Sequence, residues 1–598
     1  MLRGRNINRA STNIPDSQPR GSDFASLNSP VSPAVSSRVA LLFIVLTATA
    51  VIAPLFFLGN PSGHDIQFHL SSWMDAARQW REGIIVPRWS EWANWGFGEP
   101  RFIFYPPISW TLGAALGSLL PWELVPGAMI WISLVVAGFS MWILAREWLP
   151  GPAAVAAAIF FAADPYHLVM LYYRSDFAEL LGAALFPLLF WAALHVARGE
   201  RRYVPALSLA FAAIWLCNDP AGVMATYSVV LAILIVCIAQ RSPRGLFWSA
   251  LALAAGFALA AFYLFPAVYE QRWVQIASAI NDSLQPPHNF LFAHNNELGF
   301  VQFNMRVSRV AIAMIASTCI AGVFFARRYR SFRVLWWVLL AVAISSTFIM
   351  LPPSLFLWRL LPKLWFVQFP WRWMDTLAIP LAIFVAGAAE SFRKRWAFWL
   401  VLVIAAAGLV TVAALIIHDA WWDSEDASYL TRGIDAGHGF DGTDEYAPLG
   451  VSHWDLPGEP PTDDKEAPPP AETLRIQQLN QDTGDVIPLT GASVIYQSWF
   501  AEKRIFTVKT DKPVSLVVRL LNYPAWGVQI DGTRIQPGYV DVTGQMVLPV
   551  TTGLHQIDIL FRRTRDRTLG IVISLLAAAG LFAFARFFPF PDTRRSVE

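Results

Sequence analysis

The stretch VALLFIVLTATAVIAPLFFL, from Val39 to Leu58, is followed by GNPSGHDIQFHL, from Gly59 to Leu70. The first part has the length and apolar composition of a helix that crosses a bilayer, which needs about 20 such residues. The second part places one carboxylate, Asp65, and two imidazoles, His64 and His69, just beyond that span. We therefore expect polar, reactive side chains at a membrane surface.

The composition extends this prediction to the whole chain. Of the 598 residues, 55% are hydrophobic and only 15% are charged, whereas a soluble domain carries about a quarter charged residues. The net charge of +2 gives no reason to expect a polyanion, so no nucleic-acid partner is predicted. The chain is predicted to be an all-α polytopic membrane protein with the lipid bilayer as its first partner.

About twelve transmembrane helices are expected from the apolar stretches. They lie near 39–58, 123–145, 151–165, 177–197, 204–218, 220–239, 246–266, 308–326, 334–352, 373–390, 397–417 and 568–586. The apolar segment 106–121 is short and has prolines at both ends. If it does not cross, every arginine-rich loop falls on one side, as short cytoplasmic loops require. We therefore predict that 106–121 is a re-entrant or interfacial hairpin.

The predicted spans divide the chain into five parts. These are a disordered cytoplasmic tail (1–37), a multi-span membrane domain (38–417, with an outer loop at 59–121), a Pro/Gly/acidic linker (418–472), an extracytoplasmic β domain (473–566), and a final transmembrane helix with a short cytoplasmic tail (567–598). Alternating runs at 504–510, 514–521 and 555–562, with the turn signal Asp531-Gly532, predict that the β domain is a small sandwich.

The outer loop 59–121 is expected to begin with an amphipathic helix. Apolar residues recur at helical spacing, namely Leu70, Trp73, Met74, Ala77 and Trp80, which is typical of a helix lying at a membrane surface. Asp65 stands at its start and has two compatible interpretations. It can cap the helix through its side chain, or it can act as a general base or metal ligand.

The aromatic segment 89–107 follows this helix. It is dense in Trp, Phe and Tyr and is interrupted by Gly and Pro. One interpretation is an aromatic belt at the membrane interface. The alternative is a wall that contacts a sugar or a lipid chain.

Two further motifs carry charge at predicted outer ends of spans. In the expected outer turn 164–179, Asp176 and Glu179 are three residues apart, so they share a helix face next to Arg174. They predict either ion pairs with Arg174 or a carboxylate site for a divalent cation, Mg²⁺ or Mn²⁺. Arg372 lies between two tryptophans and is either a snorkelling arginine or an anion-binding residue.

Four motifs together resemble a known family. They are Gly63-His64-Asp65, the FYPP run at 104–107, the YRSDFAE run at 173–179 and the QFPWR run at 368–372. They resemble the bacterial membrane proteins labelled "6-pyruvoyl-tetrahydropterin synthase-related", although nothing here supplies the zinc-binding histidine set of the soluble synthase. The architecture is similar to that of C-type (GT-C) membrane glycosyltransferases.

This resemblance implies a function and assigns roles to residues. It implies transfer of a sugar from a polyprenyl-phosphate donor to a glycan, lipid or protein acceptor at the outer face of the bacterial inner membrane. Asp65 would be the catalytic base. The remaining roles would be binding of substrate or phosphate by Arg372, Arg174, His64 and Gln368, and binding of a metal ion by Asp176 and Glu179.

Two other classes of function remain open from the residues alone. A transporter or flippase of lipid-linked sugars would need polar or interrupted helices at the midplane and, preferably, an internal repeat. The sequence contains few mid-span charges and no visible repeat. A non-catalytic envelope assembly protein would depend on the β domain at 473–566 and not on the carboxylates.

Overall fold

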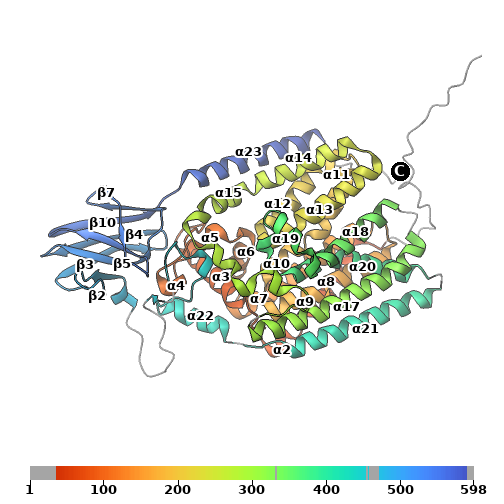
Figure 1. The fold of residues 1–598 in the computed structure, drawn as a ribbon, viewed down its shortest axis with the longest axis horizontal. Coiled ribbons are helices and arrows are strands. Elements are labelled where there is room, and N and C mark those ends of the chain that lie inside the picture. The colour runs from red at the N-terminus through yellow and green to blue at the C-terminus, as the bar shows by residue number, and fades with distance from the viewer. Residues whose placement is uncertain are drawn as a thin grey trace, which may run out of the picture.

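The computed structural model describes residues 35–588, except 296, 330–332, 393, 424, 453–454 and 457–470. The predicted disordered tail therefore lies almost wholly outside the described residues, as do the last ten residues and most of the Pro-rich part of the predicted linker. Within the described residues, the chain forms a large bundle of helices and a separate domain of two β-sheets (Figure 1).

Nine helical runs in the described part of the chain are long and apolar enough to cross a membrane. They are Ser37–Leu58 (α1 and α2), Trp122–Ala145 (mainly α7), Gly151–Arg174 (α8, α9 and a π-helical turn), Phe177–Ala197 (α10 and α11), Asp219–Gln240 (α13), Leu298–Tyr329 (α17), Pro370–Glu390 (mainly α20), Arg395–Asp419 (α21) and Arg565–Phe587 (α23). Two bent pairs raise the number to eleven: Pro243–Leu259 (α14) with Ala261–Trp273 (mainly α15), and Val334–Ile349 (in α18) with Pro352–Leu360 (mainly α19).

The described residues thus contain nine to eleven candidate spans by length and composition, against about twelve expected. The predicted span 151–165 and the outer turn after it form one helical run that continues to Arg174. The predicted span 204–218 is α12, Val204–Cys217, a shorter helix of 14 residues that packs among α11, α13 and α14. Helix α6, Pro107–Gly117, has 11 residues and is shorter still, as expected for a segment that does not cross.

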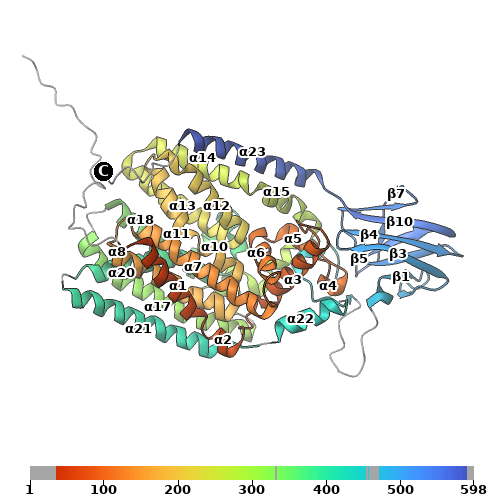
Figure 2. The same ribbon diagram turned by 180° about the vertical axis from the view of Figure 1, so that it is seen from behind.

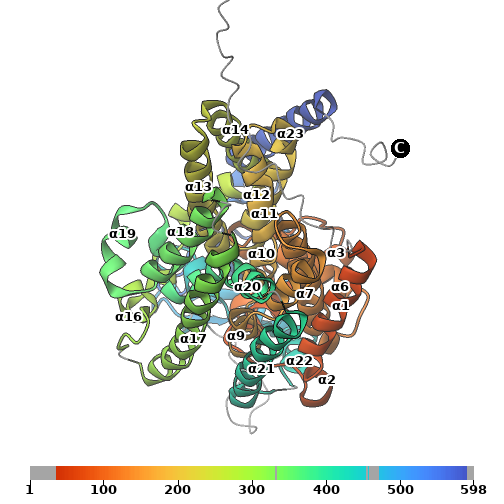
Figure 3. The same cartoon turned by 90° about the vertical axis from the view of Figure 1, so that its right-hand side faces the viewer.

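The bundle is layered around α20, Met374–Glu390. In the view along the long axis, α20 lies near the centre, with α7, α17 and α21 around it (Figure 3). In the most apolar part of the run Pro370–Glu390, 83% of the residues are buried. The corresponding share is 6% in Arg395–Asp419 and 17% in Arg565–Phe587. The last two runs therefore present most of their apolar surface outward, where lipid would cover it.

The C-terminal strands form a β-sandwich of two antiparallel five-stranded sheets. The strand orders are β2-β1-β5-β9-β8 and β3-β4-β10-β6-β7. The strands are β1 Ile476–Leu479, β2 Val486–Pro488, β3 Ala492–Phe500, β4 Lys503–Thr510, β5 Val514–Leu521, β6 Trp526–Ile530, β7 Thr533–Ile535, β8 Gly538–Tyr539, β9 Gln545–Val550 and β10 Gly553–Phe561. The predicted hairpin is confirmed, because Ile530 pairs with Thr533 across Asp531-Gly532, both of which have positive φ as this turn requires.

The β-sandwich is joined to the helices by a shared core. Figures 1 and 2 show it at one end of the bundle, with α3, α4 and α5 of the outer loop between it and the long helices. These short helices are Ile66–Arg81, Ala93–Gly96 and Arg101–Phe104. Trp89 and Phe97 from the outer loop are fully buried in the same cluster as Phe506 and Ile557 from the sandwich. Trp89 and Phe97 of the expected aromatic belt therefore pack against the β domain, whereas Phe102 packs in the core of the helical bundle.

The predicted linker 418–472 contains an ordered helix at its start. Helix α22, Asp426–Asp435, has a buried face that includes Leu430 and Ile434 and packs against α3. The sequence signal is the apolar spacing of these residues within a region otherwise dominated by Gly, Pro and acidic residues. This segment therefore covers the outer loop.

Candidate active site

Arg174 lies at the end of an irregular helical turn. The π-helical turn Met170–Arg174 ends at Ser175, which has a left-handed backbone with φ of 54°. The next helix, α10 (Phe177–Ala183), begins at once, and the Asp176 side chain caps it by accepting from the Glu179 N–H at 3.0 Å. The motif at 173–179 thus breaks the helix so that three charged side chains meet.

The segment before α3 is attached to this break through its backbone. The Gly63 N–H donates to Ser175 Oγ at 3.1 Å, and the Asp65 N–H donates to the Arg174 carbonyl at 2.8 Å. A Cβ on Gly63 would lie 2.4 Å from the Arg174 carbonyl carbon. Glycine is therefore required here for close approach, and this contact brings Asp65 next to Arg174.

Five side chains form an arginine–carboxylate cluster. Arg174 Nη2 lies 3.1 Å from Asp65 Oδ2 and 2.7 Å from Asp176 Oδ2. Arg174 Nη1 lies 2.7 Å from Glu179 Oε2. Arg372 Nε lies 2.9 Å from the same Glu179 oxygen, and Arg372 Nη2 lies 3.7 Å from Asp176 Oδ2. Two guanidinium groups thus face three carboxylates, and the ion-pair interpretation of this motif is the one that the geometry supports.

The surroundings keep Asp176 ionised. Burial by itself would raise the pKa of Asp176, but the Arg174 charge, the His69 ring and the Arg372 charge together hold it well below its usual range. His69 Nε2 lies 3.7 Å from Asp176 Oδ1. The side chains of Asp176 and Glu179 are only 5% and 0% exposed, so neither is open to a substrate.

Asp65 differs from the other two carboxylates because its side chain is 36% exposed. It occupies the N-cap position of α3, but its side chain makes no capping hydrogen bond. The expectation of a side-chain cap is therefore wrong, and the physical reason is that Arg174 binds the carboxylate instead. Asp65 is positioned by its backbone and by Arg174.

The expected metal site does not fit this geometry. Glu179 Oε1 accepts from the Tyr166 hydroxyl at 2.7 Å, and Oε2 is bound by Arg174 and Arg372. Both Asp176 oxygens likewise face protein donors. A divalent cation would have to displace two arginines from these carboxylates, so we assign it no role there.

A cavity of about 390 Å³ lies against the segment that carries Asp65. It is lined by Ser62, Gly63, His64, Ile66, Gln67, Tyr173, Gly299, Gln302, Phe303, Arg306, Asp419 and Trp421. Arg306 Nε is 3.8 Å from Asp419 Oδ2, and the two side chains are 44% and 40% exposed. Burial lowers the pKa of His64 below 6.5, with Arg174 adding to this effect and Asp65 opposing it. His64 is thus a neutral hydrogen-bonding group at pH 7.

The structure separates the predicted binding residues into two groups. His64 lines the cavity, whereas Arg174 and Arg372 have side chains only 4% and 6% exposed. Gln368 accepts from Arg372 Nη1 at 3.4 Å and donates to the Ala279 carbonyl, so it supports the cluster. Sequence reasoning missed Arg306, because an arginine near the end of an apolar stretch resembles any flanking charge.

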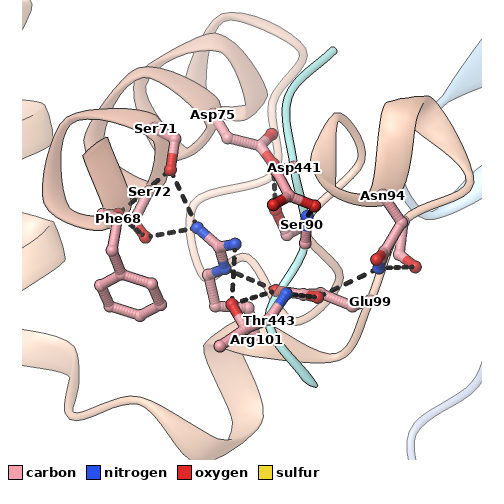
Figure 4. A network of polar contacts seen from close by, with 12 residues as sticks. Phe68, Ser71, Ser72, Asp75, Ser90, Asn94, Glu99, Arg101, Asp441 and Thr443 are labelled. Carbon is pink, nitrogen blue, oxygen red and sulfur yellow. Dashed lines mark hydrogen bonds and ion pairs between the residues drawn. The ribbon is translucent and has the colours of Figure 1, made fainter. Parts of the chain in front are cut away.

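The polar face of α3 is also buried, contrary to the expected membrane-surface helix. Arg101 Nη1 donates to Ser71 and Ser72 at 3.0 Å each, and Arg101 Nε lies 2.7 Å from Glu99 Oε1. Figure 4 shows these side chains converging from α3, from the outer loop and from Thr443. The polar side of α3 contacts protein because the outer loop and residues 441–443 fold over it.

Comparison with known proteins identifies the class of protein. The family described as "6-pyruvoyl-tetrahydropterin synthase related domain; membrane protein" matches residues 102–425. The chain belongs to this family of membrane proteins. The match includes most of the arginine–carboxylate cluster and begins after Asp65. No curated protein matches the sequence.

Several solved structures show a distant likeness. The arabinofuranosyltransferase AftD from Mycobacteria is 17% identical with a TM-score of 0.44, over 65% of this chain and 27% of that chain. The Archaeoglobus fulgidus oligosaccharyltransferase is 13% identical with a TM-score of 0.41, over 64% and 56%. ArnT from Cupriavidus metallidurans, bound to undecaprenyl phosphate, is 13% identical with a TM-score of 0.37, over 63% and 64%. This chain thus spans about a quarter of AftD and about half of the oligosaccharyltransferase.

Proposed function

We propose that this protein is an integral membrane glycosyltransferase that transfers a sugar from a polyprenyl-phosphate donor to an acceptor of the cell envelope. The observation that carries the proposal is the position of Asp65. It is the most exposed carboxylate of the arginine–carboxylate cluster, and its chain neighbours His64 and Ile66 line a cavity at the end of apolar helices. The four sequence motifs resemble this membrane family, and the similarity of its architecture to GT-C glycosyltransferases supplies the reaction class.

In the proposed reaction Asp65 acts as general base. It takes the proton of the acceptor hydroxyl while that oxygen forms a bond to the anomeric carbon of the donor. The bond from the anomeric carbon to the phosphate oxygen breaks, and its electron pair leaves with the polyprenyl phosphate. Asp65 Oδ2 is held by Arg174, while Oδ1 accepts no hydrogen bond from the described residues. We therefore assign Oδ1 as the oxygen that takes the proton.

We assign the leaving phosphate to Arg306 and not to Arg174 or Arg372. Both guanidinium groups of the cluster are buried against carboxylates, so binding a phosphate would break buried ion pairs, which costs about 3–5 kcal/mol. Arg306 lines the cavity, and its contacts with Asp419 are long and half-exposed: 3.8 Å to the carboxylate and 3.4 Å to the carbonyl oxygen. A guanidinium can bind two phosphate oxygens at once, and His64 can donate a further hydrogen bond.

We place the site on the extracytoplasmic side of a bacterial inner membrane. Arginine-rich connections follow the ends of α7, α11, α13, α17 and α20, and short cytoplasmic loops carry such charges. With α6 not crossing the membrane and α12 crossing it, these connections share one side, and the β-sandwich lies on the other. The polyprenyl chain would stay in the bilayer while its phosphate reaches the cavity.

A deletion strain tests the proposed function in cells. We expect the strain to lose an envelope glycan and to accumulate a polyprenyl-phosphate sugar, and wild type to reverse both effects. Asp65→Asn should not reverse them, whereas Asp282→Asn, in an outer loop with a 74% exposed side chain, should. Rescue by Asp65→Asn would contradict the role of Asp65 and would favour a flippase or an assembly protein.

A binding experiment tests the phosphate assignment separately. We expect purified wild-type protein to bind undecaprenyl phosphate more tightly than uncharged undecaprenol. Arg306→Gln should weaken phosphate binding about tenfold or more, because a charge-assisted hydrogen-bond pair is lost. Arg309→Gln, on the same helix but outside the cavity lining, is the matched control. Equal affinity in the two variants would contradict the assignment.

A further inference from the structure

We infer that Arg519, in strand β5 of the β-sandwich, is a positioning residue for the helix that presents Asp65. The inference rests on the proposed function, because it concerns how that site is held. It gives the β-sandwich a role inside the enzyme, in place of the role of a separate module that only binds a partner or a glycan. A series of contacts joins Arg519 to α3.

Arg519 is buried and donates to three backbone carbonyls outside its own domain. Nε lies 3.1 Å from the Trp95 carbonyl, Nη1 lies 2.9 Å from the Gly437 carbonyl, and Nη2 lies 3.1 Å from the His438 carbonyl. Its side chain thus joins the outer loop to the segment that follows α22. Burial lowers the pKa of Arg519 to about 10, with Arg475 and Arg504 adding to the effect, so the group remains charged at pH 7.

The loop that Arg519 holds has an unfavourable backbone. Asn94 and Trp95 have φ of 51° and 54°, and Gly96 has φ of 79°. A non-glycine residue in this region costs on the order of 1–3 kcal/mol and persists only where its surroundings hold it. The hydrogen bonds from Arg519 to the Trp95 carbonyl provide such a restraint. Leu521, two residues further along β5, adds a backbone hydrogen bond to the Phe97 carbonyl at 3.0 Å.

The held loop is connected to α3 by buried side chains. Asn94 Nδ2 donates to Glu99 Oε2 at 3.1 Å, and Arg101 Nε lies 2.7 Å from Glu99 Oε1. Arg101 then donates to Ser71 and Ser72 on α3. Figure 4 shows this series from Asn94 to Ser71 and Ser72.

Helix α3 transmits the restraint to the catalytic carboxylate. Ser71 lies about 7.5 Å along the helix from its first residue, Ile66, and Asp65 immediately precedes that residue. Asp75, one turn beyond Ser71, is held in addition by Ser90 Oγ at 2.7 Å and by Gln79 at 2.9 Å. The orientation of α3 is thus set by the loop that the β-sandwich restrains, and a small displacement of a general base lowers the rate strongly.

Gly96 gives a second, independent way to disturb the same contact. A Cβ on Gly96 would lie 2.6 Å from Arg519 Nη2 and 2.7 Å from Arg519 Cζ. Gly96→Ala therefore displaces the guanidinium without removing it. Arg519→Lys keeps the positive charge, but a single ammonium group cannot hydrogen-bond to all three carbonyls as the planar guanidinium does. Both variants should resemble Arg519→Gln if position matters and charge alone does not.

The test uses the full-length protein in vesicles, with the undecaprenyl-phosphate glycoside, from a panel of hexoses and pentoses, that wild type turns over fastest. We expect Arg519→Gln, Arg519→Lys and Gly96→Ala to lower kcat about tenfold or more, while the donor KM stays within about twofold. Arg534→Gln, an exposed arginine on β7, should leave both unchanged. Hydrogen exchange should rise in residues 93–99 and in the first turns of α3, and not in α13.

Two outcomes would overturn the inference. One is an unchanged kcat in Arg519→Gln while Asp65→Asn is inactive, which would leave the proposed function in place and remove the positioning role. The other is unchanged hydrogen exchange in α3 in both Arg519→Gln and Gly96→Ala. Full activity of Asp65→Asn would contradict the proposed function itself, and the exchange result would still decide whether Arg519 holds α3.

Discussion

Asp65 accepts a hydrogen bond from Arg174 at 3.1 Å although 109 residues separate them in the chain. The same arginine binds Asp176 and Glu179, so its guanidinium connects the exposed carboxylate to two buried ones. A second arginine, Arg372, binds the same pair from the short turn Pro370–Trp373 that precedes α20. The position of the proposed base therefore depends on three separate parts of the helical bundle.

Gly63→Ala should displace Asp65 without changing any charged group. The added Cβ would lie 2.4–2.7 Å from backbone atoms of Arg174 and Ser175, and backbone atoms cannot move aside cheaply. We expect activity to fall roughly 100-fold, in line with a misplaced general base, with a loss of about 1–3 kcal/mol in stability. Gly299→Ala is the matched control, because it lines the same cavity and its Cβ would meet nothing within 4 Å. Similar activities in Gly63→Ala and Gly299→Ala would contradict the requirement for a glycine at position 63.

Glu179→Gln should destabilise the protein more than any exposed Glu→Gln change. The carboxylate is fully buried and bound by Arg174, Arg372 and the Tyr166 hydroxyl. Without this negative charge, the two buried guanidinium groups are only partly balanced by carboxylates, which costs about 3–5 kcal/mol of stability. Thermal unfolding in detergent measures the change, with exposed Glu123→Gln as control. If the Tm values of the two variants agreed within about a degree, the cluster would not be a structural ion network.

Chelation tests whether Asp176 and Glu179 hold a metal ion. Because their oxygens face arginine, tyrosine and backbone donors, we expect transfer activity to persist after treatment with EDTA and dialysis. The measurement is turnover of a polyprenyl-phosphate glycoside before and after Mg²⁺ or Mn²⁺ is restored. Loss of activity on chelation, with recovery on adding the ion, would return the metal role to these carboxylates.

The large elements of the fold could be predicted from periodicity and length. Apolar runs of bilayer length mark most of the spans, and the Asp531-Gly532 turn marks a hairpin, because local sequence determines both. The membrane-surface role of α3 could not be excluded in this way. Its spacing of Leu70, Trp73 and Met74 is the same whether lipid or protein covers it, and only the fold brings Arg101 onto Ser71 and Ser72.

The candidate site was predicted only in part for the same reason. Asp65, Arg174, Asp176, Glu179 and Arg372 stood out because charges beside spans are costly. Their partners depend on contacts between distant segments, so the sequence alone could not decide between an ion-pair cluster and a metal site. Arg306 has no local signature that separates it from other arginines at helix ends, and its place in the cavity follows from the packing of α17 against the segment before α3.

Glu91 should make stability depend on pH where the outer loop meets the β-sandwich. Burial raises the pKa of Glu91 from 4.5 to about 8, with Arg504 opposing and Glu82 adding to the rise. Between these values the folded state binds a proton that the unfolded state does not. The stability from this group is therefore full below pH 4.5 and is lost as pH rises through about 8. Glu91→Gln stays neutral, so the difference between its Tm and that of wild type should increase between pH 6 and 9.

The control for this pH effect is Glu425→Gln, because Glu425 is exposed. We expect the difference in Tm between Glu425→Gln and wild type to stay constant over the same range. A constant difference for Glu91→Gln as well would mean that Glu91 is ionised in the folded protein at neutral pH.

In the proposed reaction Asp65 removes a proton from the acceptor during sugar transfer. The direct measurement is the single-turnover rate of purified Asp65→Asn in vesicles, with a donor that wild type uses and with donor binding measured in parallel. We expect the rate of Asp65→Asn to be at least 100-fold lower than that of wild type, with unchanged donor affinity. Asp282→Asn should behave like wild type. A single-turnover rate for Asp65→Asn within about twofold of wild type would contradict the role of Asp65 as general base.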